Sequence, residues 1–330
     1  MILIRLWITL AIGSASLAAQ PTELLVLEKL SSELGFYTAD GKRLAGVPVG
    51  GHPHELLLSA DGSQAYTTDN GKVWMTDPGE GGNTVSIIDI EARKRAGQIN
   101  LGNFRCPHGI DLDPRSGRLV VTTENPDRLL LIDPAKQAIV RDYDTKGKSP
   151  HMVTLGPRYE WAYVSNTESA TIAAIHLESG ETKLIPCGKR PQGGTLSKNG
   201  KRLYVVNSGS GSITVIDTDR RSAVRTILVG KGPGRVELTP DGKDLIYSLG
   251  EDQAVGFASL GSGKQTAAIP LGTRPLSLTL SGDGEFAYVG GQEIDTVFVI
   301  SVRERRIVRK FKTPNQAGPD PVLQISRGGQ

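Results

Sequence analysis

The sequence lacks the features that mark membrane-anchored and nucleic-acid-binding proteins. Beyond the first 18 residues, no stretch is long and apolar enough to cross a bilayer. The 38 basic and 35 acidic residues leave a formal net charge of +3, which is too weak to indicate a nucleic-acid partner. We therefore expect a soluble globular body with no membrane span and no nucleic-acid ligand.

Several catalytic motifs are also missing. The chain has no Gly-x-Ser-x-Gly elbow and no Gly-x4-Gly-Lys-Ser/Thr phosphate loop, so serine-hydrolase and nucleotide chemistry lack support. It has no Cys-x2-Cys-His motif, which argues against covalently attached haem. The sequence does not exclude a non-covalent cofactor and does not identify one.

The first 18 residues are typical of a secretory signal peptide. Arg5 supplies a positive charge, residues 6–12 form a short apolar core, and residues 16–18 are a small-residue cleavage site. We expect the mature chain to begin near Ala19 or Gln20, to form one domain over residues 19–330, and to act in the periplasm or outside the cell. We also expect a monomer.

Turn residues are abundant, with 40 glycines and 19 prolines, and they divide the chain into short apolar segments. The stretch from Lys189 to Gly230 shows the pattern completely. Its four β-branched runs are separated by polar turns, including Asn199-Gly200, and such runs favour strands over helices. The stretch therefore predicts a small sheet of four strands.

The same unit recurs along the chain. An anchor proline opens each copy, at separations of 54, 43, 41, 42, 42 and 46 residues: Pro53, Pro107, Pro150, Pro191, Pro233, Pro275 and a degenerate Pro321. This period indicates a repeat array. Because one small sheet cannot bury both of its faces, neighbouring units must stack, and a closed ring of such sheets is a β-propeller.

The two ends of the chain predict how the ring closes. Residues 23–28, 33–39 and 43–49 match the second, third and fourth strands of a unit that has no first strand. Residues 321–326 match a lone first strand. Six whole units and these fragments predict an all-β, seven-bladed propeller of four-stranded antiparallel blades, closed by a composite blade that protects the open edges.

The second strands carry a recognisable motif. Tyr163-Val164-Ser165-Asn166, Tyr204-Val205-Val206-Asn207 and Tyr288-Val289-Gly290-Gly291 resemble the repeats of the seven-bladed YVTN propeller family, with Tyr66-Thr67-Thr68-Asp69 a looser version. The resemblance spans nearly the whole mature chain and implies the propeller fold. Related propellers include sugar lactonases and the haem-binding propeller of nitrite reductase, so the resemblance alone does not fix a function.

Histidines provide the strongest functional signal. Three of the five follow an anchor proline directly, at His54, His108 and His151, and this position lies at one mouth of the central channel in such a propeller. Three imidazoles that converge can hold a divalent transition metal, with Glu55 or Glu124 as the catalytic base. The alternative is structural, because a histidine in this position can simply cap its loop.

Two further features belong to the same mouth. Asn70 to Asn83 enclose an insertion of roughly twelve residues, in which Trp74 is placed to cover a ligand. A basic group precedes five of the anchor prolines and predicts an anion-binding ring: Arg105, Lys148, Lys189, Arg190, Lys231 and Arg274. Solvated loop charges and a tolerated surface insertion are the alternatives.

Two function classes therefore stay open. The first is an exported binding or scaffold propeller that holds a small anionic molecule, a cofactor or an envelope protein at its mouth. The second is a metal-dependent enzyme with lactonase- or lyase-type chemistry. Cys106 and Cys187 fall in anchor loops two blades apart, so we expect separate thiols rather than a disulfide.

Overall fold

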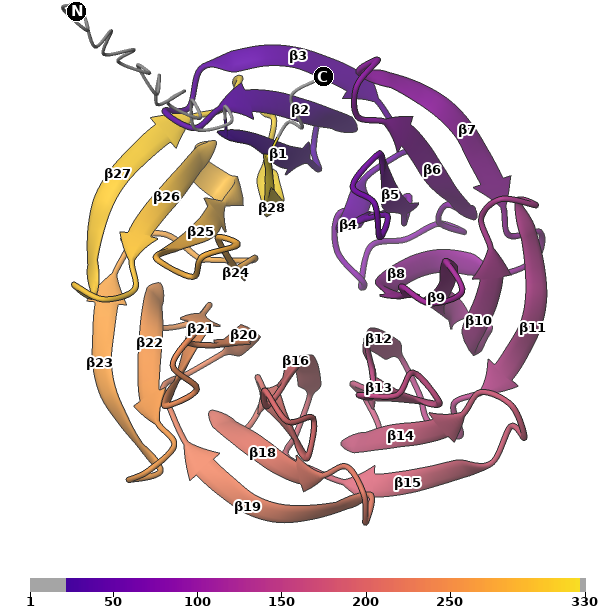
Figure 1. The fold of residues 1–330 in the computed structure, drawn as a ribbon, viewed down its shortest axis with the longest axis vertical. Coiled ribbons are helices and arrows are strands. Elements are labelled where there is room, and N and C mark those ends of the chain that lie inside the picture. The colour runs from indigo at the N-terminus through magenta and orange to yellow at the C-terminus, as the bar shows by residue number, and fades with distance from the viewer. Residues whose placement is uncertain (1–21, 327–330) are drawn as a thin grey trace, which may run out of the picture.

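The computed structural model describes residues 22–326, which form seven four-stranded sheets around a central channel (Figure 1). All strand pairs are antiparallel, so the predicted seven-bladed β-propeller is confirmed. None of the helical turns in the described part of the chain has the length and apolar character needed to span a membrane. The predicted signal peptide, residues 1–18, lies outside the described residues.

Blades 1 to 6 follow one another along the chain, each built from its innermost to its outermost strand. Blades 1 to 3 consist of β4 (Pro53–Leu58), β5 (Gln64–Asp69), β6 (Thr84–Asp89), β7 (Lys94–Asn100), β8 (Arg105–Asp113), β9 (Arg118–Asn125), β10 (Asp127–Asp133), β11 (Ala138–Asp144), β12 (Pro150–Leu155), β13 (Trp161–Asn166), β14 (Thr171–His176) and β15 (Thr182–Pro186).

Blades 4 to 6 repeat this plan, and the chain ends supply blade 7. Their strands are β16 (Pro191–Leu196), β17 (Arg202–Asn207), β18 (Ser212–Asp217), β19 (Ser222–Leu228), β20 (Pro233–Leu238), β21 (Asp244–Leu249), β22 (Ala254–Ser259), β23 (Lys264–Pro270), β24 (Thr279–Leu280), β25 (Phe286–Gly291), β26 (Thr296–Ser301), β27 (Arg306–Lys312), and then β28 (Pro319–Ser326), β1 (Thr22–Glu28), β2 (Glu33–Thr38) and β3 (Arg43–Pro48).

Burial follows the place of each strand in its blade. The second and third strands, such as β17 and β18, are apolar on both sides and almost entirely buried, because each blade packs between two others. The fourth strands, such as β19, lie on the rim and are largely exposed. The predicted turn at Asn199-Gly200 is present, with Gly200 at a φ of +68°.

The hydrophobic core is divided among the blade interfaces. Seven clusters of buried side chains lie between adjacent blades, and each draws on both neighbours. Tyr66 and Ile110, for example, join blade 1 to blade 2. Since every blade contributes to two clusters, the blades support one another around the whole ring.

The composite blade closes the ring as predicted. In blade 7 the C-terminal strand β28 pairs with the N-terminal strand β1, and Leu25 lies opposite Leu323. The predicted anchor Pro321 was wrong, however. Pro319 pairs with the last residue of β1 just as Pro53 pairs with the last residue of β5, so the equivalent proline lies two residues earlier.

Both cysteines are free thiols, as predicted. Cys106 is buried beside the inserted loop, where its Sγ lies 3.6 Å from the Glu80 carbonyl oxygen. Cys187 is partly buried against the interface between blades 3 and 4. Cys106 lies in β8 of blade 2 beside the inserted loop of blade 1, whereas Cys187 follows β15 of blade 3, so the two thiols belong to different blades.

Leu25 tests the importance of the closure. It is fully buried between blades 7 and 1, so Leu25→Ala should lower the free energy of unfolding by about 2–5 kcal/mol. Urea denaturation measures this loss. Leu228→Ala is the control, because Leu228 is 73% exposed and its truncation should change stability by less than about 0.5 kcal/mol. Equal effects of the two substitutions would contradict the interpretation.

Candidate functional site

A β-bulge at the start of the innermost strand, present in every blade except blade 6, creates the site. In β4 the pairing passes from Pro53, opposite Asp69, to Leu56, opposite Thr67. Two residues, His54 and Glu55, therefore face the single residue Thr68. Proline has no N–H to donate to the ladder, which favours an interruption here. Strands β8, β12, β16 and β20 show the same shift after their own prolines.

Hydroxyl groups fix these bulges and join neighbouring blades. Thr68 Oγ1 accepts a hydrogen bond from the Glu55 N–H in its own blade and donates one to the His108 carbonyl oxygen in the next, at 3.1 and 2.7 Å. Thr122 links the Gly109 N–H to the His151 carbonyl in the same way, at 2.8 and 2.6 Å. The backbones that carry the histidines are thus tied together from blade to blade.

The three predicted histidines do converge at the channel mouth. His54 Nδ1 lies 3.2 Å from His108 Nε2, and their rings meet edge to face. The His151 ring packs against His108 with centroids 3.8 Å apart. All three side chains are buried, and burial lowers the pKa of each imidazole well below its usual value. We therefore treat them as neutral.

The hydrogen bonds assign the protons of this cluster. The Lys72 carbonyl oxygen, 2.7 Å from His54 Nε2, can only accept, so His54 carries its proton there and accepts at Nδ1. His108 Nε2 must then donate to His54, which leaves His108 Nδ1 as an acceptor. Glu124 Oε1 lies 3.0 Å from that Nδ1 and must donate. Burial raises the pKa of Glu124 to about 7, in agreement with a protonated carboxyl.

These contacts bear on the metal hypothesis. All four ring nitrogens of His54 and His108 are engaged in hydrogen bonds. Within residues 22–326, no group of three or more His, Cys, Asp or Glu side chains is arranged to hold a metal ion. The shared metal site of His54, His108 and His151 therefore stays a prediction. His151 differs from its neighbours because its Nδ1 is buried without a hydrogen-bond partner.

Glu55 spans the channel rather than facing the histidines. It forms an ion pair with Arg235, the residue at the matching bulge position of blade 5, and both side chains are at most 15% exposed. Desolvation nevertheless raises the pKa of Glu55 to about 7, against the opposing effect of Arg235. The predicted catalytic base is thus part of a buried ion pair.

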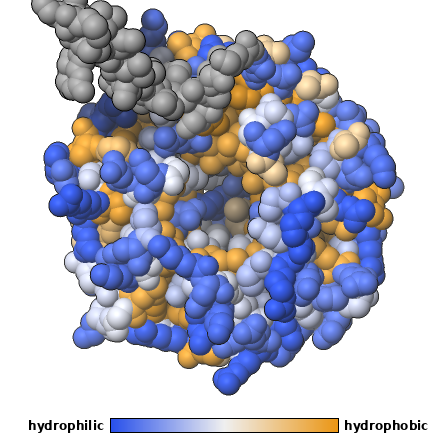
Figure 2. Space-filling view, viewed as in Figure 1, coloured by the Kyte–Doolittle hydropathy of each residue, from blue (hydrophilic) through white to orange (hydrophobic). Residues whose placement is uncertain are grey.

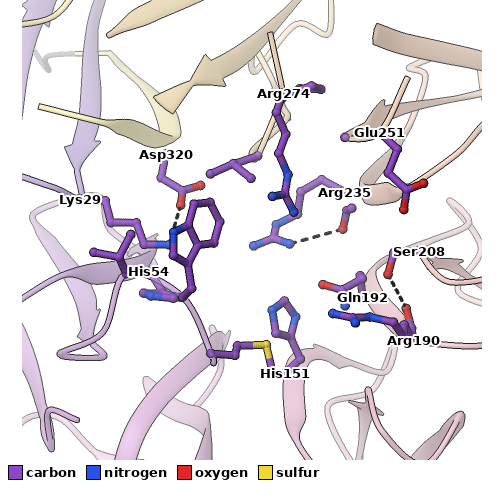
Figure 3. Close-up of a pocket in the computed structure, with 18 of the residues that line it drawn as sticks. Lys29, His54, His151, Arg190, Gln192, Ser208, Arg235, Glu251, Arg274 and Asp320 are labelled. Carbon is purple, nitrogen blue, oxygen red and sulfur yellow. Dashed lines mark hydrogen bonds and ion pairs between the residues drawn. The ribbon is translucent and has the colours of Figure 1, made fainter. Parts of the chain in front are cut away.

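A cavity of about 790 Å³ opens at this mouth, and Figure 2 shows the hollow at the centre of the ring. The three histidines line it together with charged side chains from blades 4 to 7, and Figure 3 shows Lys29 next to His54 on one side, with Arg190, Arg235 and Glu251 on the other. Those charged residues are Lys29, Arg190, Arg235, Glu251, Arg274, Glu293 and Asp320. The volume falls within the range of small-molecule sites.

Lys29 and Asp320 make a buried ion pair on the cavity wall. Lys29 Nζ lies 3.4 Å from Asp320 Oδ2, and the two side chains are 5% and 6% exposed. Asp320 follows Pro319 as His108 follows Pro107, and Lys29 and Glu124 each follow the residue that pairs with that proline, Glu28 in β1 and Thr123 in β9. Two blades thus use the same pair of positions with different chemistry.

The inserted loop covers part of the cavity, as predicted. Residues 70–83 connect β5 to β6, and Val73 to Thr76 line the wall. The Trp74 ring centroid lies 5.6 Å from Lys29 Nζ and 5.2 Å from Arg274 Cζ, so two cations contact one indole. The loop thereby places an aromatic surface beside the positive groups.

The predicted ring of basic residues is only partly at the cavity. Arg190 and Arg274 line its wall, whereas Lys148, Lys189 and Lys231 lie outside the lining. Arg105 contacts the inserted loop, with an ion pair to Glu80 at 3.1 Å. No ion pair joins Arg190 or Arg274 to a carboxylate of the described residues, so both guanidinium groups are available to a ligand.

Sequence reasoning missed Lys29, Arg235 and Asp320. Arg235 stands two residues after its anchor proline, and comparing that position among all units would have found it together with Glu55. Asp320 was missed because the anchor was placed at Pro321. In blade 2, Thr123 is the equivalent of Asp69 and Asn166, so the candidate base Glu124 lies one residue beyond the position that pairs with the anchor proline.

Asp69 and Asn166 have structural roles. The Asp69 carboxylate accepts hydrogen bonds from the hydroxyls of Thr67, Thr84 and Ser86, at 2.7 to 2.9 Å. Asn166 donates to the Thr145 carbonyl oxygen at 3.2 Å. These side chains hold the strands of a blade together and do not line the cavity.

Thr122 tests the links between blades. In Thr122→Val the Gly109 N–H and the His151 carbonyl lose a buried partner, which should cost about 2 kcal/mol or more of unfolding free energy. Thr122→Ser keeps the hydroxyl and should cost about 1 kcal/mol for the lost methyl group. Chemical denaturation measures both losses. The interpretation fails if the valine variant is as stable as the serine variant.

Glu124 supplies a test by pH. Its folded-state pKa of about 7 exceeds the usual 4.5, so its contribution to stability is fully present below pH 4.5 and is lost as the pH rises through about 7. Glu124→Gln keeps a donor for His108 and cannot ionise. The difference in unfolding free energy, variant minus wild type, should therefore rise between about pH 5 and about pH 8. Exposed Glu178→Gln is the control. A difference independent of pH would contradict the proton assignment.

Comparison with known proteins defines the fold further. The sequence matches no protein-family model and no curated protein. Among solved structures, Kuenenia stuttgartiensis hydrazine synthase matches with a TM-score of 0.68 and 18% identity, over 79% of this chain and 86% of that chain. Dihydro-heme d1 dehydrogenase NirN in complex with DHE matches with a TM-score of 0.65 and 15% identity, over 89% of this chain and 64% of that chain. A functionally unknown protein from Desulfotomaculum acetoxidans DSM 771 matches with a TM-score of 0.75 and 13% identity, over 93% of this chain and 99% of that chain. At these identities the likeness shows the propeller fold alone.

Proposed function

We propose that this protein is an exported binding propeller that holds a small organic anion in the cavity at its channel mouth. The observation that carries the proposal is the pair of guanidinium groups, Arg190 and Arg274, which line the cavity without a carboxylate partner among the described residues. Arginine binds carboxylate and phosphate groups through charge-assisted hydrogen bonds. The exported location rests on the predicted signal peptide.

The buried part of the wall supports the binding of a small molecule but does not select an anion, because the unpaired Asp320 oxygen is a hydrogen-bond acceptor. His151 Nδ1 and Asp320 Oδ1 are buried polar atoms without a hydrogen-bond partner, which is uncommon in a folded protein. Trp74 and Leu276 add apolar surface next to them. A few polar groups on a partly apolar wall are typical of a small-molecule site.

One structural neighbour gives a precedent for ligand binding. Dihydro-heme d1 dehydrogenase NirN, which contains a propeller of this fold, is in complex with DHE. We extend to this chain only the class, ligand binding by a protein that contains this fold, because 15% identity over 64% of that chain carries no information on the ligand itself.

Trp74 offers a direct measurement of binding. In a Trp161→Phe background, its fluorescence should change on titration with oxalate, citrate or inorganic phosphate, because the indole lies between two cations on the cavity wall. Arg274→Ala should weaken the tightest of these complexes by roughly tenfold or more.

Lys148→Ala is the matched control, since it removes one positive charge from a residue outside the cavity lining. It should leave the affinity nearly unchanged, apart from a small effect that salt screens. The proposal is overturned if none of the anions changes the fluorescence, or if the two substitutions weaken binding equally.

A further inference from the structure

Lys29 occupies an unusual place for a lysine. It follows β1 directly, and its N–H donates to the Gly318 carbonyl oxygen at 3.1 Å, which fixes its backbone. The residue is 4% exposed, yet its side chain forms part of the cavity wall (Figure 3). Its amine has one hydrogen-bond partner, Asp320, although an ammonium group can donate three hydrogen bonds. The remaining positions on the nitrogen are available to a ligand.

Asp320 complements this amine. Its Oδ2 contacts Lys29, whereas its Oδ1 is buried and has no hydrogen-bond partner. The carboxylate can therefore take up a proton without breaking another contact. A buried carboxylate oxygen without a hydrogen-bond partner is uncommon in a folded protein.

Burial also changes the amine itself. Desolvation lowers the pKa of Lys29, and Arg235 acts in the same direction, whereas Asp320 and Glu55 oppose the change. A larger share of the amine is then neutral at a given pH, and only the neutral form has the lone pair that attacks a carbonyl carbon.

We propose that Lys29 is a nucleophile that forms a Schiff base with a small carbonyl acid, such as a 2-oxo acid, bound in the cavity. The inference rests on the proposed anion-binding function and extends it from binding to covalent chemistry. It requires no metal and no cofactor. Asp320 is assigned as the group that carries the proton.

The step balances with the groups present. The Lys29 nitrogen lone pair attacks the carbonyl carbon, and Asp320 carries one proton from the nitrogen to the carbonyl oxygen, which becomes a hydroxyl group. Asp320 then carries the second nitrogen proton to this hydroxyl group, which leaves as water as the C=N bond forms. One carbonyl and one amine thus become one imine and one water molecule.

The position of Arg274 indicates why the carbonyl compound is an acid. Lys29 Nζ and Arg274 Cζ lie 5.6 and 5.2 Å from the centroid of the same Trp74 ring. Because both cations contact the same indole, a small acid held at the guanidinium lies in the part of the cavity that also contains the amine. Positioning of this kind is what raises the rate of a reaction between bound groups.

Reductive trapping tests the proposal. The full-length protein is incubated with glyoxylate and cyanoborohydride, which converts an imine to a stable carboxymethyl-lysine, and the modified lysines are identified by peptide mass spectrometry. Lys29 should be modified several-fold faster than Lys148 or Lys189, which lie outside the cavity lining. Lys29→Arg keeps the positive charge beside Asp320, cannot form an imine, and should lose only the modification at this site.

Glycolate separates the two proposals, because it carries the carboxylate without the carbonyl. Glycolate should compete with glyoxylate and slow the modification of Lys29 but not that of Lys148. If Lys29 is modified no faster than Lys148, or if glycolate gives no protection, the Schiff-base proposal is overturned. Glycolate binding measured through Trp74 then shows whether anion binding fails as well. Should Lys29→Arg not fold, the rates and the protection in the wild-type protein decide alone.

Discussion

The bulge after the anchor proline, present in every blade except blade 6, is the constraint on which the site depends. A proline cannot donate to the strand ladder, and the pairing resumes only three residues later, so two consecutive side chains leave the regular sheet. In blade 1 these are His54 and Glu55. The hydroxyls of Thr68 and Thr122 hold the bulged backbone of one blade against that of the next. The same contacts therefore build the ring and place its functional side chains.

Ring closure and the site are also connected. Lys29 and Asp320 come from opposite ends of the chain and meet because β1 and β28 form one sheet. Their ion pair lies on the cavity wall and is almost inaccessible to solvent. A chain that did not close its seventh blade would lose both partners, so the cavity exists only in the complete ring. The stability of the fold and the chemistry of the mouth share this one contact.

Blade repetition makes one geometry available to different chemistry. In blades 2 and 7 the residue after the anchor proline contacts the residue that follows the proline's pairing partner in the second strand, and the two pairs are His108 with Glu124 and Asp320 with Lys29. In the first pair both groups are assigned as neutral, and Glu124 donates a hydrogen bond to His108. The second pair is a buried ion pair. The repeat fixes where the side chains meet, and the residue types decide what they do.

The sequence by itself determined the architecture. The spacing of the prolines predicted the number of blades, and the unmatched segments at the two ends predicted how the ring closes. Both features depend on local turn chemistry and strand periodicity. The convergence of His54, His108 and His151 followed from the same register, and so did the place of the Trp74 loop.

Only the tertiary structure decided which groups meet across the channel. Glu55 and Arg235 are 180 positions apart, and Lys29 and Asp320 are 291 apart, so no local pattern pairs them. The two-residue error at Pro321 hid Asp320, since a bulge changes the register without leaving a sign in the hydrophobic pattern. The sequence also does not distinguish an exposed charged residue in one loop from a buried one in the next, because burial depends on the closed ring.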